Sequence, residues 1–468
     1  MLESIQELSQ QKAAEFLNTF YFQYGHRSIA DLAHLVFGLE QISILAAIAV
    51  VDEPVWDGQE RSTRYQPFRK TGWYLPEEVA NTEAEPVFAR TAEALFSAYE
   101  DLTKALVEHL VDAVPRPAEM PDGVYRRTLR ARAFDVARSL LPLATHTSVG
   151  QVVSARVLER QIGRLLGSPY PEVRAVGQAL KDACQVPAEA PLGDLDTAAP
   201  AAPTLVKYAD ASPYPATVGA ELRAAADELL TASGPANRGH AVELAEPSTD
   251  PLDEIVATLL YRYDCAGHSY CQVQQVVREL SQARKDELFA LSLASRSAHD
   301  DLLREHRAGY GLVFDVLVDL GSFRDLHRHR RCVQVQQPLT WEHGFLLPEH
   351  VFGHGLGPQA ALEALEAGLG DTYVESLNKA EQAASAVRLV SPLAADYLLP
   401  LGYRTRCLFK MDWAQAAYLI ELRTGPGGHF SYRRIAWGMY QALRARHPTL
   451  AAPIRATDPE GPLDLLRR

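Results

Sequence analysis

Residues 137–165 read ARSLLPLATHTSVGQVVSARVLERQIGRL, and residues 395–423 read ADYLLPLGYRTRCLFKMDWAQAAYLIELR. The tetrapeptide LLPL is identical in both stretches, so Pro142 corresponds to Pro400. Each copy is followed by a strand-like stretch and then by a helix-like one. A repeated order of motif, strand and helix indicates a tandem duplication of one domain. The alternative is chance similarity between helices rich in Leu and Ala.

A second pair of stretches agrees with the duplication. YGHRSIADLAHLVFGLEQIS (24–43) resembles CAGHSYCQVQQVVRELSQ (265–282), which pairs His26 with His268 in the same order along the chain. Between the two halves lies VPAEAPLGDLDTAAPAAP, which has no apolar periodicity and is typical of a linker. We therefore predict an N-terminal repeat over 1–185, a linker over 186–203 and a C-terminal repeat over 204–468.

Apolar periodicity predicts a chain dominated by helices. AEALFSAYEDLTKALVEHLVDAV (93–115) carries apolar residues at three- and four-residue spacings, as an amphipathic helix does. Shorter runs such as VRLVS (387–391) and YRTRCLFKM (403–411) favour strands. Segregated helices and strands predict an α+β fold, helix-rich with a small antiparallel sheet in each repeat.

Composition indicates a globular protein and excludes several classes of partner. The 468 residues carry 46 Lys+Arg against 59 Asp+Glu, with a formal net charge of −13. This balance argues against general binding to nucleic acid or to an anionic membrane. The longest apolar run, ISILAAIAVV (42–51), is too short to span a membrane. No secretory signal is apparent, and five sparse cysteines fit reduced thiols, so we expect a cytoplasmic protein. Cys265, His268 and Cys271 fit no common zinc spacing, so we expect no metal site.

A basic cluster stands out against the acidic background. Between Arg324 and Arg331 the chain has four arginines and two histidines. On a strand, Arg328 and Arg330 would share a face, and the planar fork of arginine suits phosphate groups. The alternative is a solvated turn whose charges are balanced by nearby acidic residues.

A second candidate for anion binding is ERSTRYQPF, residues 60–68. Glu60, Ser62 and Arg64 alternate, so on a strand or extended loop they would project together. A carboxylate, a hydroxyl and a guanidinium can hold a phosphate and a sugar, although an exposed polar strand is the alternative. Arg138 and Arg156 are further candidates, with ordinary exposed helix arginines as the alternative.

Taken together, these pieces resemble the flavin-dependent thymidylate synthases. That family has G-H-x-[ST], then R-H-R followed by E-x-S-x-R-Y, then A-R-x-x-L-P and N-A-R. The first repeat has GHRS (25–28), ERSTRY (60–65), ARSLLP (137–142) and SAR (154–156), but it lacks R-H-R. The second has GHS (267–269) and RHR (328–330) and keeps IELRT (420–424), but it lacks the E-x-S-x-R part. The second repeat also has Thr340, Asp396 and Ala414 where the family has arginines.

The division of motifs between the repeats implies composite sites. Family members are homotetramers whose active sites draw residues from more than one subunit, so each repeat can lose what the other supplies. Two duplicated chains would then replace four subunits, and we expect a homodimer that is a pseudo-tetramer of repeats. Random decay of the motifs predicts no such complementarity.

The resemblance also implies roles for individual residues. The implied substrate-binding residues are Glu60, Ser62, Arg64, Arg138, Arg328 and Arg423. The implied cofactor-binding residues are His26, Ser28, Arg156, His268, Arg328, His329 and Arg330. Arg423 would stabilise the uracil ring as it becomes electron-rich, and Arg328 would reach the nucleotide, so these two are the implied catalytic residues. Asp31 replaces a family Glu, and Ser154 replaces the Asn of N-A-R.

The implied reaction is the reductive methylation of dUMP to dTMP, with FAD as cofactor and methylenetetrahydrofolate and NADPH as co-substrates. Two alternatives stay open. The first is a related C5 modification of another uridine nucleotide, and the second is a non-catalytic homologue that binds nucleotide or flavin.

Overall fold

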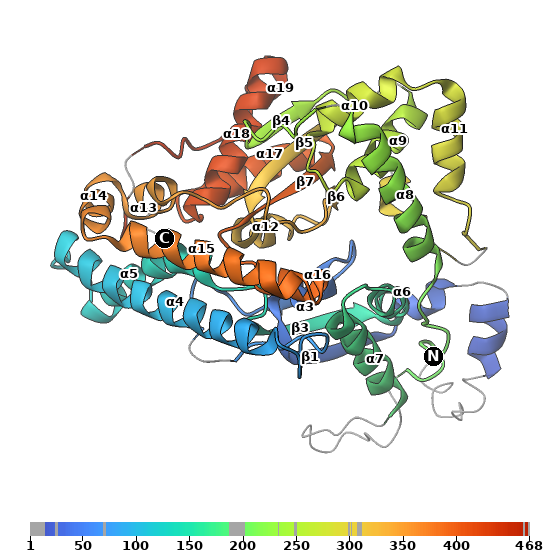
Figure 1. Cartoon of the computed structure of the whole chain (residues 1–468), viewed down its shortest axis with the longest axis horizontal. Helices are drawn as coiled ribbons and strands as arrows, with labels where there is room; N and C mark the ends of the chain where they lie inside the picture. Colours follow the sequence, from blue (N-terminus) through green and yellow to red (C-terminus); the bar gives the residue numbers. More distant parts are fainter. Residues whose placement is uncertain are drawn as a thin grey trace, which may run out of the picture. The chain divides into compact units, whose positions relative to one another are not determined.

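Two compact units make up the chain, whose course is shown in Figure 1. The computed structural model describes residues 15–23, 27–68, 72–186, 202–232, 234–247, 250–297, 300, 302–306, 311–461 and 464–466. The first unit contains residues 1–61 and 146–213, and the second contains 62–145 and 214–468. These packing units cut the chain differently from the sequence repeats, because 62–145 folds with the C-terminal half. Most of the expected linker, 187–201, lies outside the described residues.

The first unit is built around a small antiparallel sheet. Its elements are a π-helix at Leu17–Gln23, a 3₁₀ helix at Arg27–Asp31, β1 (His34–Ser43), α3 (Ile44–Val51), β2 (Asp57–Glu60), β3 (His146–Ser154), α6 (Ala155–Leu166) and α7 (Pro171–Gln185). The strand order is β1-β3-β2. Ser43 caps the N-terminus of α3 by accepting a hydrogen bond from the Ala46 N–H, and the Glu172 carboxylate anchors the Ser43 hydroxyl from α7.

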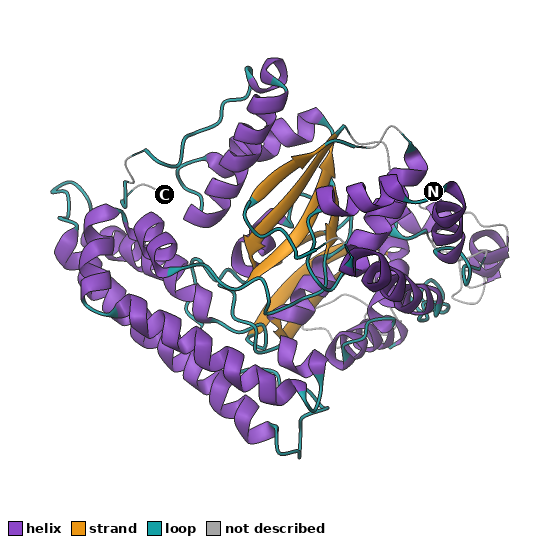
Figure 2. Ribbon diagram, turned by 45° about the horizontal axis from the view of Figure 1, so that its top comes forward, coloured by secondary structure: helices purple, strands orange, loops and turns teal. Residues whose placement is uncertain are grey.

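The second unit holds a four-stranded antiparallel sheet in the order β4-β5-β7-β6. Its strands are β4 (Val242–Ala245), β5 (Leu312–Asp319), β6 (Val333–Gln336) and β7 (Arg404–Met411). Every residue of β5 is buried, so both faces of the sheet are covered. Helices α9 and α10 pack on one face, and α18 contacts β4 and β5. Figure 2 shows helices around the orange strands.

The helices of the second unit are long and numerous. Their bounds are α4 (Glu85–Ala113), α5 (Asp122–Ala137), α8 (Tyr214–Thr231), α9 (Pro251–Tyr263), α10 (Tyr270–Glu279), α11 (Gln282–Leu291), α12 (Leu320–Leu326), α13 (Pro348–Leu356), α14 (Pro358–Glu366), α15 (Leu369–Arg388), α16 (Pro392–Asp396), α17 (Trp413–Thr424), α18 (Phe430–Arg446) and α19 (Pro448–Ala451), with 3₁₀ turns at Arg138–Leu140 and Arg304–His306.

Helix α4 from the first repeat packs against both α5 and α15, which lie beside it in Figure 1. Its buried residues recur every three or four positions, which gives one continuous apolar face: Phe88, Ala92, Leu95, Tyr99, Leu102, Leu106 and Leu110. Helix α15 belongs to the second repeat, so this packing joins the two halves of the chain within one core.

The two LLPL segments pair with each other. Pro142 and Pro400 form an antiparallel bridge. The Leu143 N–H donates to the Leu399 carbonyl at 2.9 Å, and the Leu401 N–H donates to the Leu141 carbonyl at 2.9 Å. Leu143 corresponds to Leu401 and Leu141 to Leu399, so the two hydrogen bonds are equivalent and are related by a local two-fold axis. The identical tetrapeptides therefore form the contact between the copies.

The α+β prediction is confirmed, with one small antiparallel sheet from each repeat. The strand expected at YRTRCLFKM is β7, but the strand expected at VRLVS is wrong: that run is the end of α15 and the turn after it. Among the described residues, no helix is long and apolar enough to cross a membrane.

Candidate functional site

The RHRR segment lies in a turn between α12 and β6. Because the segment is not on a strand, the expected shared face of Arg328 and Arg330 is not formed. The side chain of Arg328 is 48% exposed and lies 4.0 Å from the Asp325 carboxylate, and that of Arg331 is 73% exposed. Arg330 is half-buried, whereas His329 is buried. The segment thus presents positive charge outward around one buried imidazole.

His329 is held against Arg423, which lies on α17. The Arg423 Nε donates to His329 Nε2 at 2.7 Å, and the side-chain amide of Gln415 lies 3.4 Å from Nδ1. Burial, with the nearby Arg423, lowers the pKa of His329 to about 3. The imidazole is therefore neutral at neutral pH and acts as an acceptor. It orients the Arg423 guanidinium without neutralising its charge.

Arg64 is buried in the loop that follows β2. Its Nε and Nη2 donate to the two carboxylate oxygens of Asp135 at 2.8 and 3.1 Å, and its Nη1 donates to the Tyr432 hydroxyl at 3.0 Å. Burial alone would lower the pKa of Arg64, but Asp135 raises it above its usual value. The loop is also closed locally, since the Arg64 N–H donates to the Ser62 hydroxyl at 3.2 Å.

Arg138 joins the two repeats through a buried ion pair. Its Nη1 and Nη2 both lie 3.2 Å from Asp325 Oδ2, and its Nη1 lies 3.4 Å from the Thr63 hydroxyl. Burial would raise the pKa of Asp325, but Arg138 and Arg64 hold it below its usual value. Asp325 comes three residues before Arg328, so the pair ties the A-R-x-x-L-P arginine of one repeat to the R-H-R turn of the other.

Tyr432 on α18 was not identified from the sequence, although it lies at the centre of this group. The Arg64 guanidinium lies 5.6 Å and the Arg423 guanidinium 5.2 Å from the centre of its ring, both within cation–π range. Asp135 was also missed. An isolated tyrosine among arginines and an aspartate inside a helix carry no distinctive spacing, so only the folded chain reveals these two residues.

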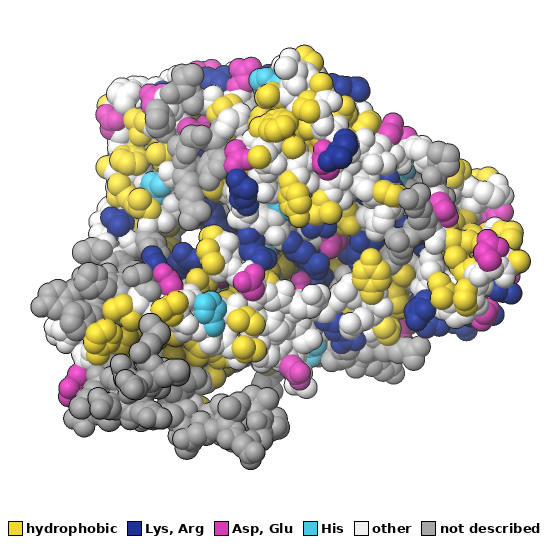
Figure 3. Space-filling view, turned by 180° about the vertical axis from the view of Figure 1, so that it is seen from behind, with side chains coloured by type: hydrophobic (Ala, Val, Ile, Leu, Met, Phe, Trp, Pro, Cys, Tyr) yellow, Lys and Arg dark blue, Asp and Glu magenta, His cyan; other side chains and the backbone are white. Residues whose placement is uncertain are grey.

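The structure therefore brings together five residues or motif pieces that the sequence singled out, all within the second unit: Ser62, Arg64, Arg138, the 328–330 turn and Arg423. We call this group, with Asp135, Asp325 and Tyr432, the arginine cluster. Arg64 and Arg138 are bonded to carboxylates, whereas Arg423 faces a neutral histidine and Arg328 lies at the limit of ion-pair range. Arg328 and Arg423 thus keep charge available for an anion. Lys and Arg side chains also gather across the middle of the face shown in Figure 3, although the chain is acidic overall.

Comparison with known families also finds two matching segments along the chain. The family model described as "Thymidylate synthase complementing protein" matches residues 1–190 and again 260–449. The chain belongs to this family. The double match confirms the expected relation to the flavin-dependent thymidylate synthases and the tandem arrangement.

Two relatives that match nearly the whole chain are named UPF0159 proteins. A UPF0159 protein of Chlamydia muridarum is 28% identical over 97% of this chain and 82% of its own length. A UPF0159 protein of Thermoplasma acidophilum is 26% identical over 97% of this chain and 90% of its own length. Both relatives thus match this chain across the segments of both repeats.

Several residues that the family resemblance selected lie in the first unit or outside the described residues. Glu60 ends β2, and Arg156 begins α6, where it pairs with Asp31 at 3.0 Å. Both partners of that pair are about half exposed. The backbone of Ser28 is helical, while its side chain and all of His26 lie outside the described part of the chain.

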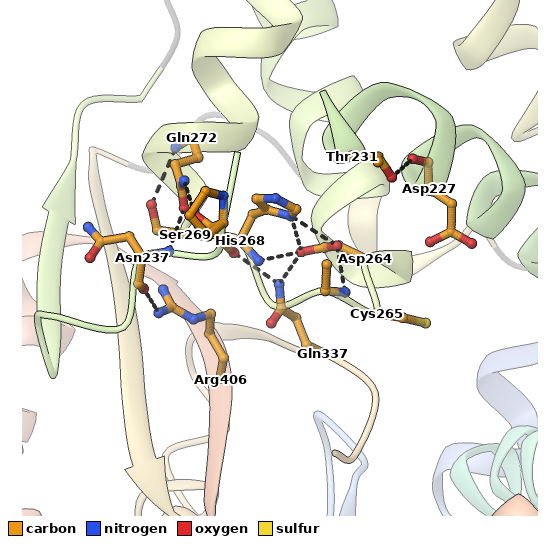
Figure 4. Close-up of polar contacts among 12 residues, drawn as sticks. Asp227, Thr231, Asn237, Asp264, Cys265, His268, Ser269, Gln272, Gln337 and Arg406 are labelled. Atoms are coloured by element: carbon orange, nitrogen blue, oxygen red, sulfur yellow. Dashed lines mark hydrogen bonds and ion pairs between the residues drawn. The ribbon is translucent and has the colours of Figure 1, made fainter. Parts of the chain in front are cut away.

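His268, the second-repeat member of the G-H pair, lies in a separate polar network shown in Figure 4. Its backbone N–H and its Nδ1 contact the Asp264 carboxylate, and its Nε2 lies 2.8 Å from the Gly234 carbonyl. The hydrogen bond to Asp264 raises the pKa of His268. Gln337 donates to the His268 carbonyl at 3.2 Å. Both ring nitrogens of His268 thus have partners, and none of these partners belongs to the arginine cluster.

Proposed function

We propose that this protein carries out the FAD-dependent reductive methylation of dUMP to dTMP, with methylenetetrahydrofolate and NADPH, at a composite site shared by its two repeats. One observation carries the proposal: the motif pieces missing from each repeat are supplied by the other within a single compact unit. Arg64 and Arg138 come from the first repeat, and the 328–330 turn and Arg423 come from the second. Membership of the family supports the class of reaction.

The residues of the arginine cluster would have different roles in binding and catalysis. Arg328 and Arg423 would bind the nucleotide directly, because no carboxylate of the described residues lies closer than 4.0 Å to cancel their charges. Arg423 would stabilise negative charge developing on the uracil ring, with His329 fixing its direction. Arg138 would contact the nucleotide from the opposite repeat. Arg64 is saturated by its own partners, so it would hold the Ser62 loop in place rather than touch the phosphate itself.

The charged surface beside the arginine cluster fits a cofactor with a diphosphate. Arg328 is half exposed, and Arg330 is half-buried next to it, so guanidinium groups with solvent access lie beside the nucleotide-binding arginines. When bound, the flavin supplies the hydride chemistry of the reaction. His329 would contribute through Arg423, whereas His26, Ser28, Arg156, Glu60 and His268 stay candidate contacts.

The first experiment is the visible absorption spectrum of the purified protein with FAD, before and after dUMP is added. We expect a bound flavin whose band shifts with dUMP. In Arg423→Gln and Arg328→Gln, dTMP formation should fall by about 10²–10³-fold, as when one oxyanion-stabilising donor is lost. Arg331→Gln is the matched control, because it removes a neighbouring, 73% exposed arginine, and it should stay within about threefold of the wild type.

Other outcomes separate the alternatives. A protein that gains no flavin contradicts the proposal outright. A flavin band that responds to UMP and not to dUMP assigns the site to another uridine nucleotide. Binding of both ligands without any dTMP indicates a non-catalytic homologue.

We also propose that the enzyme is a homodimer in the cytoplasm, where its five free cysteines would remain reduced. Two chains would supply the four repeats of a pseudo-tetramer. Sedimentation equilibrium should give twice the chain mass of 51.6 kDa, and a monomer at micromolar concentration contradicts this assembly.

A further inference from the structure

A second basic cluster lies in the C-terminal repeat and shares no residue with the arginine cluster. Arg404 and Arg406 are two residues apart on β7, so they project on the same face of the sheet. Arg406 is buried and pairs with Asp315 at 2.7 Å, and it also donates to the Asn237 carbonyl, as Figure 4 shows. The residue after Asn237, Arg238, is 40% exposed, so this group of arginines reaches the surface.

His343 is the buried ring at the centre of these arginines. It is 1% exposed, and neither of its ring nitrogens has a hydrogen-bond partner among the described residues. Its position is fixed by close packing against Gly267, where a Cβ would come 2.5 Å from the His343 Cε1. Burial and the surrounding arginines Arg406, Arg238 and Arg404 lower its pKa to about 3.

Other polar atoms around His343 are also left without partners. Among the residues that the structure describes, buried atoms without a hydrogen bond include Gln337 Oε1, Trp341 Nε1, Arg404 Nε and Arg406 Nε. A buried polar atom without a partner costs about 1–3 kcal/mol of stability. Several such atoms in the 337–343 segment and on β7 are therefore unusual for a protein core. Most of these atoms are N–H donors, and donors gathered in one place suit an acceptor-rich ligand.

The charges in this cluster do not balance. Asp315 neutralises Arg406, and Glu342 lies 4.0 Å from Arg238 but is 70% exposed. Arg404 is half-buried and makes no ion pair with any described carboxylate. Burial and the like charges of Arg238 and Arg406 lower its pKa. One half-buried cation is therefore left for an anion from outside.

We propose that Arg238, Arg404 and Arg406, with His343, form a binding site for a phosphate group, either inorganic phosphate or a small phosphate monoester. Guanidinium forks and an imidazole N–H match the several acceptor oxygens of a phosphate. The site shares no residue with the arginine cluster, so it stands independently of the proposed synthase activity. Arg404 is its central residue because its charge lacks a partner in the described part of the protein.

The test is titration calorimetry with inorganic phosphate in a phosphate-free buffer. Arg404→Gln should weaken binding at least about tenfold, the usual effect of losing a charge-assisted contact. Arg238→Gln should weaken it as well, and because Arg238 is partly exposed this variant tests the site even if Arg404→Gln does not fold. Arg388→Gln removes an exposed arginine at the end of α15 and should leave the affinity within about twofold.

The arginine cluster is the main competing site, and Arg328→Gln distinguishes the two. Binding that survives in Arg328→Gln and is lost in Arg404→Gln supports the second site. Binding lost only in Arg328→Gln, equal affinities in Arg404→Gln and the wild type, or no binding at all overturns it. Glycerol 3-phosphate then separates the sources: tighter binding than inorganic phosphate assigns a phosphorylated metabolite, and weaker binding assigns the free ion.

Discussion

Arg64 and Arg138 are buried arginines that the first repeat contributes to the second unit. Each is matched by a carboxylate, Asp135 for Arg64 and Asp325 for Arg138. Burying such pairs costs desolvation energy that their attraction only partly offsets, so stability alone does not explain them. Their geometric effect is specific, because they fix the Ser62 loop and the R-H-R turn relative to α5. The Arg64 pair is best understood as positioning the Ser62 loop, and the Arg138 pair as positioning the R-H-R turn in addition to the proposed nucleotide contact of Arg138.

Replacing Arg64 with Ala should therefore be far more damaging than replacing an exposed arginine. Arg64→Ala leaves the Asp135 carboxylate buried without its cation, and we expect a loss of about 3–5 kcal/mol in the free energy of unfolding. Arg126→Ala is the control, because its pair with Asp122 lies on the same helix and is about 60% exposed. That change should cost less than about 0.5 kcal/mol. Equal losses in urea denaturation would contradict the role of the buried pair.

The sequence identified the arginines of the cluster but not their neighbours. Arg64, Arg138 and Arg328 sit in recognisable motif pieces. Asp135 and Tyr432 do not, because their significance depends on which residues the fold brings against them. The shared face of Arg328 and Arg330 depended on the segment being a strand, and the structure has the alternative, because the end of α12 and the start of β6 leave only a turn between them.

At the scale of elements, the paired LLPL segments are one of the contacts that join the repeats. Gly402 directly follows the second LLPL, and its N–H donates to the Ser139 carbonyl at 2.8 Å. A Cβ at this position would lie 2.9 Å from the Tyr373 hydroxyl and 3.0 Å from the Ser139 carbonyl oxygen. The segment therefore requires a residue without a side chain here.

Gly402→Ala should destabilise the protein by about 1–3 kcal/mol, since the backbone of Ser139 cannot move aside without disturbing the pairing. Gly353→Ala is the matched control. Gly353 lies inside α13 with no atom within 4 Å of the place that an added methyl group would occupy, and alanine favours helix, so the change should be neutral or slightly stabilising. Chemical denaturation of both variants measures the difference. A loss in Gly353→Ala as large as that in Gly402→Ala would refute the steric argument.

Element type was predictable where local pattern and packing agree. YRTRCLFKM became β7 because its residues are buried between neighbouring strands. VRLVS has the same β-branched character, but Val387 continues the buried face of α15, so helix packing decided its conformation. Short apolar runs of this kind are ambiguous until their neighbours are known.

At the scale of the whole molecule, the repeats and the packing units differ. Residues 62–145 belong to the first repeat, yet they pack in the second unit. In particular, α4 covers α15 with an apolar face that the C-terminal repeat cannot replace. The packing of α4 on α15 thus crosses the boundary between the two repeats.

Expression of 204–468 alone should consequently fail to give a stable fold. Each large apolar side chain of α15 that stays exposed loses about 1.5–3 kcal/mol of burial free energy. A few such losses equal the free energy of unfolding of a typical domain, roughly 5–15 kcal/mol. We expect an aggregated or loosely folded fragment by circular dichroism and size-exclusion chromatography. Co-expression with 1–186 should restore a cooperative thermal transition, and a fragment that folds stably by itself would contradict this division of the core.

The sequence by itself determined the duplication, the α+β class and the complementary loss of motifs, because these are recorded in residue identity and order. Only the tertiary structure decided which segments share a core and which carboxylates and aromatic ring surround the arginines. Those contacts join residues up to several hundred positions apart, such as Arg64 and Tyr432. They depend on the pairing of the two LLPL segments and on the packing of α4 from the first repeat against α15 from the second. Neither contact can be predicted from a local sequence pattern.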